Sequence, residues 1–232
     1  MFPNTWQQIT SETDNWFIRD RVHRIDRRLR VLSIAGSELS FFPEVRLLRC
    51  KVSKPEGENQ YLYGLYYAGQ LFALDFTNRP IFKFCDDYGV YWNAATAIDY
   101  LRFFFSFVKS RNGFFQVLSS PDDILIDETL CSPHMPNYKR ENHGELHYYD
   151  IPPKERSAKL KSLIKAPQFL SGSHLREYTM RLPILFMDSI YSSVLRVYGA
   201  GRVEFIDEEL LICGLPIKKP DSLSGYLYGY WS

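Results

Sequence analysis

The segment at residues 94–111, AATAIDYLRFFFSFVKSR, constrains the fold of this chain more than any other stretch. Asn93 precedes it as an N-cap and Asn112-Gly113 can end it, so the segment is predicted to be a helix. Apolar side chains fall on most of the circumference of that helix. A helix of this kind has to be buried on several sides. We therefore expect a buried, Phe-rich helix at about 93–111, against which the rest of the chain packs.

Short runs of β-favouring residues lie on both sides of this helix, separated by Gly, Pro and Asn turns, and they predict antiparallel strands. The predicted strands lie at 44–54, 60–67, 71–76, 81–84, 113–119, 176–187, 193–198, 202–206 and 209–217, with a hairpin turn at 199–201. The aromatic share of 16% suits strands and a core built on rings. The predicted fold class is α+β, with a mostly antiparallel meander sheet packed on the Phe-rich helix.

The 232 residues are predicted to form a single domain, 1–232. Two β-rich halves, at about 40–120 and 170–232, are joined by a helical and loop-rich middle. This middle contains a Pro-rich loop region near 129–153 and a short helix at 152–166. Because the middle does not look like an open linker, one sheet that gathers strands from both halves is favoured over two subdomains.

An amphipathic, Arg-rich helix is predicted at 14–32. Its apolar side chains recur at steps of 4, 3, 4 and 3, namely Ile18, Val22, Ile25, Leu29 and Leu32. Between residues 19 and 30 it carries six arginines against two aspartates, a local net charge of +4.

Arg24, Arg27 and Arg28 are the candidate partner-binding residues of this helix, since guanidinium groups can grip carboxylates and phosphates. The alternative is a solvated face with Asp20/Arg24 and Asp26/Arg30 pairs at i,i+4. Nucleic acid is a further, less favoured partner, because no aromatic side chain interleaves the basic run.

The aromatic tail SGYLYGYWS supplies a second candidate protein-binding surface. In an extended strand Tyr226, Tyr228 and Tyr230 share one face, and Trp231 follows them. Tyr and Trp are enriched at binding surfaces. Ordinary strand packing with hydroxyls that reach solvent is the alternative.

The stretch His143-Gly144-Glu145-Leu146-His147 is the candidate metal-ligating motif. A helical zinc-protease motif needs Glu directly after the first His, and that spacing is absent. In an extended strand His143, Glu145 and His147 face one way. Cys131 and His134 could add ligands for zinc or another divalent metal. A polar loop without metal is the competing interpretation.

Composition and terminal pattern predict a cytoplasmic protein without a membrane segment. The N-terminal residues lack the basic and apolar segments of a signal peptide, and the apolar run at 97–113 is interrupted by charges and too short to cross a bilayer. The four cysteines are far apart and form no CxxC, which suits a reducing compartment. The net charge of +1 gives no general affinity for polyanions.

Nucleophile-elbow, P-loop and dinucleotide-binding motifs are absent from the sequence. We therefore expect a non-catalytic interaction or accessory protein, without a cofactor, that acts as a subunit of a complex or a homo-oligomer. A metal-dependent hydrolase or nuclease that uses the 131–147 cluster is the first alternative. Nucleic-acid binding through the Arg-rich helix at 17–32 is the second.

Overall fold

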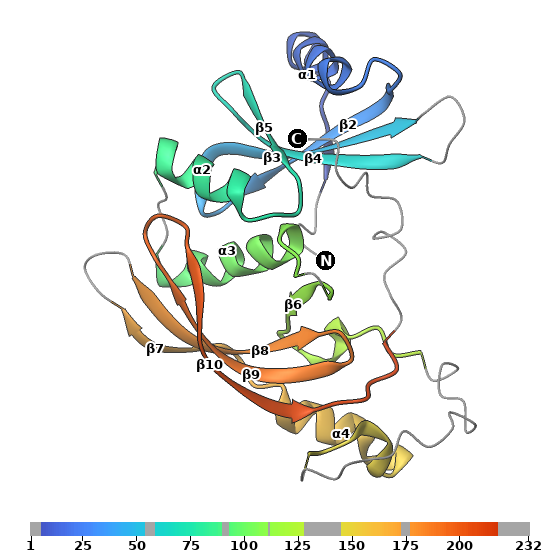
Figure 1. Cartoon of the computed structure of the whole chain (residues 1–232), viewed down its shortest axis with the longest axis vertical. Helices are drawn as coiled ribbons and strands as arrows, with labels where there is room; N and C mark the ends of the chain where they lie inside the picture. The colour runs from blue at the N-terminus through green and yellow to red at the C-terminus, as the bar shows by residue number, and fades with distance from the viewer. Residues whose placement is uncertain are drawn as a thin grey trace. The chain divides into compact units, whose positions relative to one another are not determined.

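The computed structural model describes residues 6–53, 59–89, 93–110, 112–127, 145–172 and 177–217 of the chain (Figure 1). The described residues fall into two compact units. The first unit runs to Val108 and also includes Gly199–Gly201, whereas the second comprises Lys109–Tyr198 and the residues that follow from Arg202. Whether the chain behaves as a single domain stays a prediction.

The first unit contains a five-stranded antiparallel sheet, in the order β1-β2-β3-β4-β5. Its strands are β1 (Gln7–Gln8), β2 (Arg30–Leu39), β3 (Phe42–Ser53), β4 (Gln60–Tyr67) and β5 (Gln70–Leu74). Ala68 and Gly69 join the last two strands with φ angles of 47° and 75°. Positive φ at both turn residues matches the twist of a hairpin. The meander predicted for this part of the chain is thereby confirmed.

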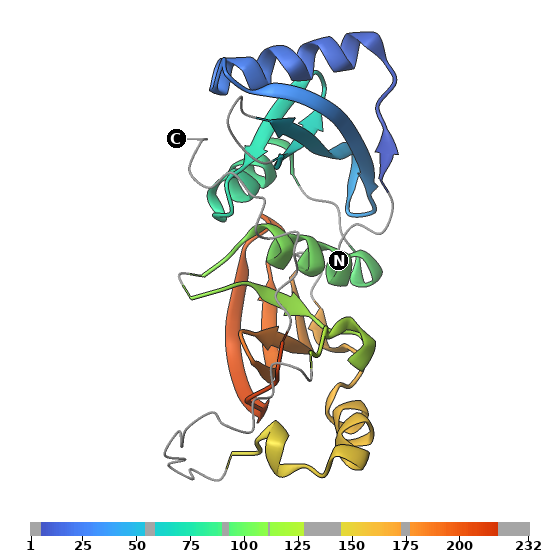
Figure 2. The ribbon, with the colours of Figure 1, turned by 90° about the vertical axis from the view of Figure 1, so that its right-hand side faces the viewer.

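Three helices cover the two faces of this sheet (Figure 2). On one face α1 (Glu12–Ile25) buries Ile18 and Val22 against strand residues such as Ile34 and Leu48. On the other face lie α2 (Arg79–Tyr88) and α3 (Ala94–Phe107). The first unit is therefore a helix–sheet–helix sandwich.

Aromatic rings fill the layer between the sheet and α3. Phe41 and Phe42 at the turn between β2 and β3 meet Tyr100 with ring centroids 5.5 and 6.1 Å apart, and Phe42 meets Phe84 of α2 at 5.2 Å. Seven residues of α3 are buried, including four phenylalanines. The buried Phe-rich helix predicted from the sequence is confirmed.

The Arg-rich helix predicted at 14–32 is shorter than expected, because α1 ends at Ile25 and Arg30 already begins β2. Asp26 takes an extended conformation and its Oδ1 accepts the Arg28 N–H at 2.9 Å. An Asp side chain that bonds nearby backbone in this way competes with helix continuation. Leu29 and Leu32 lie beyond the end of α1, so they continue its apolar spacing in the sequence only by coincidence.

The strand predicted at 81–84 is also wrong, since these residues belong to α2. Pro80 lies in the first turn of α2, where its fixed φ favours a helix. Ile81, Phe84 and Cys85 then share one buried face at helical spacing. Four residues are too few to separate a strand from a buried helical turn by hydrophobicity.

The second unit contains another antiparallel sheet, in which β10, β9, β8 and β6 are neighbours in that order and β7 also pairs with β8. Its strands are β6 (Phe115–Val117), β7 (Gln168–Gly172), β8 (Tyr178–Phe186), β9 (Ser189–Val197) and β10 (Val203–Ile212). The strands predicted at 202–206 and 209–217 are one bulged strand, β10. The hairpin predicted at 199–201 is confirmed, because Val197 pairs with Val203.

Short helices and loops cover one face of the second sheet. These elements are η1 (Pro121–Asp123), η3 (Tyr148–Asp150) and α4 (Pro153–Leu163). Tyr148 and Leu160 are buried in a core that also contains Ile190 and Ile212 of the sheet. The predicted single sheet is therefore wrong, because the described strands form two separate sheets. None of the helices in the described part of the chain is long and apolar enough to cross a membrane.

Candidate functional site

A basic groove lies in the first unit where the end of α1 meets the start of β2. It has a volume of about 590 Å³. Its lining residues are Arg19, His23, Arg27, Arg28, Leu29, Arg30, Val31 and Leu32. Four of these lining residues are arginines, and the carboxylate of Asp26 beside the groove pairs with one of them, Arg28, so the local net charge is +3 when His23 is counted as neutral. We call this feature the basic groove.

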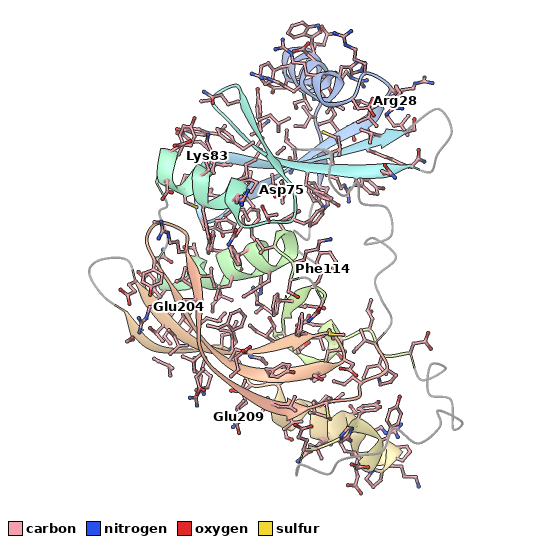
Figure 3. The ribbon with its side chains drawn as sticks, viewed as in Figure 1. Arg28, Asp75, Lys83, Phe114, Glu204 and Glu209 are labelled. Carbon is pink, nitrogen blue, oxygen red and sulfur yellow. The ribbon has the colours of Figure 1, made fainter. Side chains whose placement is uncertain are left out.

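Two of the arginines of the basic groove are held by hydrogen bonds. The Nη1 of Arg19 donates to the carbonyl of Val31 at 2.9 Å, which ties α1 to β2. Arg28 donates from Nε and Nη2 to the two carboxylate oxygens of Asp26 at 3.1 and 3.2 Å. Such a fork-to-carboxylate pair fixes the guanidinium plane. Figure 3 shows Arg28 at this end of α1.

Arg27 and Arg30 are exposed, and neither forms an ion pair with a carboxylate of the described residues. Arg27 lies in the turn after α1, and Arg30 is the first residue of β2. Their guanidinium groups are therefore available to an anionic partner. Leu32, which is 40% exposed, adds an apolar side chain to the same groove.

Trp16 lies on the same face of α1 as Arg19 and His23, since the three residues are spaced by three and four positions. The side chain of Trp16 is 69% exposed. An exposed Trp beside arginines is the composition typical of interface hot spots. Trp16 was not among the site residues predicted from the sequence, although its spacing from Ile18 already placed it off the apolar stripe of the helix.

The structure places the predicted partner-binding arginines differently. Arg27 and Arg28 line the basic groove, whereas Arg24 does not and pairs with Asp20 at 2.9 Å, as predicted. The predicted Asp26/Arg30 pair is absent from the described residues because Asp26 binds Arg28 instead. The other predicted partner-binding residues, Tyr226, Tyr228, Tyr230 and Trp231, lie outside the described residues.

A second cluster lies in the second unit and joins Glu145, His147 and Cys213. One ligand atom from each side chain lies within 4.8 Å of the other two. Glu145 is exposed, and the other two residues are half-buried. We call this set the Glu-His-Cys cluster. Of the predicted metal ligands it contains Glu145 and His147, while Cys131, His134 and His143 lie outside the described residues.

Backbone hydrogen bonds hold the Glu-His-Cys cluster together. His147 and Cys213 form a parallel bridge, in which the Cys213 N–H donates to Leu146 O at 3.1 Å and the Tyr148 N–H donates to Cys213 O at 2.9 Å. His147 is extended, with φ −95° and ψ 141°. His143 and Gly144 lie outside the described residues, so an extended 143–147 stretch stays a prediction. Cys213 was missed because no local spacing links it to residues so distant in the chain.

Negative charge surrounds the thiol of Cys213. Burial raises the pKa of Cys213, and the carboxylates of Glu145, Asp188 and Asp150 raise this pKa further. A thiol with a raised pKa is a poor nucleophile at neutral pH. The raised pKa therefore does not favour Cys213 as a nucleophile, and the carboxylates that raise this pKa also favour cations near the sulfur.

Comparisons of the chain with protein-family models, with curated proteins and with solved structures gave no match.

Proposed function

We propose that this chain is a non-catalytic interaction protein of the cytoplasm, and that its basic groove binds a carboxylate-rich surface of a protein partner. One observation carries the proposal: Arg19, Arg27, Arg28 and Arg30 line one groove. No acidic residue is among its described lining residues, and the adjacent Asp26 is already paired with Arg28. Placement in the cytoplasm is supported by Cys50 and Cys85, which are buried in apolar surroundings as free thiols.

The basic groove is preorganised for an anionic surface. The hydrogen bonds of Arg19 and Arg28 fix two guanidinium groups in the free protein. Binding therefore costs less conformational entropy at these two side chains. Arg27 and Arg30 remain exposed for new ion pairs. The positive charge of the groove arginines also speeds association with an acidic partner and repels basic ones.

Apolar contact area next to the charges favours a protein over a nucleic acid as the partner. Trp16 and Leu32 expose 69% and 40% of their surface beside the arginines. Burial of such side chains at the centre of an interface supplies most of its affinity, whereas the charged rim supplies orientation. A single exposed Trp on this face of α1 is too little to stack successive bases.

The chain itself carries an acidic surface of the required kind on β10. Glu204, Asp207, Glu208 and Glu209 of this strand are exposed, and Figure 3 shows Glu204 and Glu209 along it. The β10 strand of a second copy is therefore the first partner to test. Salt screens such contacts, so the association has to weaken as the ionic strength rises.

Light scattering after size exclusion, at low and high salt, tests the proposal. We expect wild-type protein to associate at low salt and Arg27→Glu/Arg30→Glu to lose at least about tenfold in association constant, since hot-spot truncations cost over 1 kcal/mol each. Arg79→Glu/Lys83→Glu on α2, where both residues are exposed, is the matched control and has to behave as wild type.

If the wild type is monomeric, the same two variants are compared as baits in the native host extract. A protein retained by wild type and by the α2 control but lost by the groove variant supports the proposal. A monomer whose retained proteins do not differ between the variants contradicts it. Salt-sensitive binding of a duplex oligonucleotide that the groove variant abolishes would instead establish the nucleic-acid alternative.

A further inference from the structure

We propose that Glu145, His147 and Cys213 form a zinc-binding site in the second unit. The carboxylate, imidazole and thiol of these residues lie within 4.8 Å of one another. The site is separate from the basic groove and does not rest on the function proposed for that groove. Neither the residues before Glu145 nor the last residues of the chain are needed for it.

The backbone brings the three side chains together before any metal binds. The two hydrogen bonds between 146–148 and Cys213 fix the register of His147 against Cys213. Gly214 has φ +72°, and a Cβ at that position would lie 3.4 Å from Nδ1 of His147. The positive φ, rather than this ordinary contact distance, favours glycine at the turn after Cys213.

The donor set selects a borderline metal. Thiolate and imidazole suit zinc and its first-row neighbours, whereas calcium and magnesium require oxygen donors. Donor atoms bound tetrahedrally at roughly 2.0–2.3 Å from zinc lie about 3.5 Å apart. The donor atoms of the cluster lie within 4.8 Å of one another, so the longest of these distances has to shorten by about 1 Å when zinc binds. The exposed side chain of Glu145 is free to make most of that adjustment.

Charge balance also suits a divalent cation. A thiolate and a carboxylate neutralise Zn²⁺ in the first coordination shell, and three protein ligands leave a fourth position for water. The carboxylates of Asp150 and Asp188 act on the sulfur of Cys213 from outside this set. Their negative charge raises the local affinity for a cation without requiring that either residue coordinate it.

Calorimetric titration of metal-stripped protein with Zn²⁺ tests the site. We expect about one zinc ion per chain, and Co²⁺ in its place has to give a sulfur-to-metal charge-transfer absorption band. Cys213→Ala has to remove that band, and Glu145→Gln or His147→Ala has to weaken zinc binding at least about tenfold, as even outer-shell changes do.

Exposed Glu155→Gln and Asp87→Asn are the matched controls and have to bind zinc as wild type does. Thermal melting of each apo variant shows whether it folds, and zinc has to raise the melting temperature of wild type and both controls but not of folded cluster variants. If a ligand variant fails to fold, a second measurement on wild type tests the site: Zn²⁺ has to protect the Cys213 thiol from an alkylating reagent. Zinc binding that survives the three cluster substitutions, or no binding by wild type, overturns the proposal.

Discussion

Gly201 is a residue at which backbone conformation and packing both exclude a side chain. It has φ +79°, and a Cβ on it would collide with the sulfur of Cys85 and lie 3.0 Å from the hydroxyl oxygen of Tyr100. The hydroxyl of Tyr100 donates to the Gly201 carbonyl, and Tyr100 is fully buried. Burial and the neighbouring Cys85 raise the pKa of Tyr100 well above its ordinary value, so the phenol stays protonated and keeps donating.

Gly201→Ala is therefore expected to destabilise the protein by about 3 kcal/mol, since strain at positive φ and overpacking add. Gly69→Ala is the matched control, because Gly69 has φ +75° but no atom within 4 Å of the Cβ position. It should lose only the conformational part, about 1 kcal/mol. Urea unfolding of the two variants measures the difference, and equal losses would contradict the packing argument.

At the residue scale, the sequence predicted two of the three members of the Glu-His-Cys cluster and two of the four arginines of the basic groove. Local spacing sufficed for Glu145 and His147, because neighbours in an extended segment face one way. It could not identify Cys213, since a bridge between distant segments leaves no periodic trace. Arg30 was assigned to the wrong element, and only the turn at Asp26 brings it beside Arg27.

At the scale of elements, α3 was predictable because each local signal agreed. The side-chain oxygen of its N-cap Asn93 accepts from the backbone N–H groups of Ala95 and Thr96 at 2.9 and 3.0 Å. The Thr96 hydroxyl in turn accepts from the backbone N–H of Asn93, which completes a capping box. The apolar circumference of α3 then demanded burial. By contrast, α2 is a short element, and its Ile81–Phe84 segment suited a strand equally well.

Asn93→Ala is expected to cost about 1 kcal/mol, because it leaves helix N–H groups without their acceptor. Asn78 provides the matched control, since it stands at the N-cap of α2 but makes no side-chain capping bond. Asn78→Ala should therefore cost a few tenths of a kcal/mol or less. Thermal or urea denaturation compares the two, and a loss at Asn78 as large as that at Asn93 would refute the assignment.

At the scale of the whole molecule, the sequence predicted hairpins correctly and sheet membership incorrectly. The turns at 68–69 and 199–201 depend on local residues such as glycine, so the sequence predicts these hairpins. Whether hairpins from two halves share one sheet depends on edge pairing between distant strands, which hydrophobic alternation does not encode. The result is two sheets, with a basic groove in one unit and an acidic strand in the other.

This charge segregation allows a charge-swap experiment. Glu208→Lys/Glu209→Lys on β10 should abolish self-association, as Arg27→Glu/Arg30→Glu does, because each change sets like charges against each other. An equimolar mixture of the two variants should associate again at low salt, since the reversed groove then faces a reversed strand. Light scattering measures this recovery. A mixture that stays monomeric while wild type associates would show that β10 is not the surface bound.

The position of β10 at one end of its sheet, among the described strands, has a consequence for aggregation. An edge strand offers unpaired backbone groups to any other extended chain. On β10 the ladder is interrupted between Phe205 and Asp207, and the exposed carboxylates of Asp207, Glu208 and Glu209 follow directly. Two such edges repel each other. We therefore expect these acids to oppose strand-to-strand association between copies of the chain, whatever else they bind.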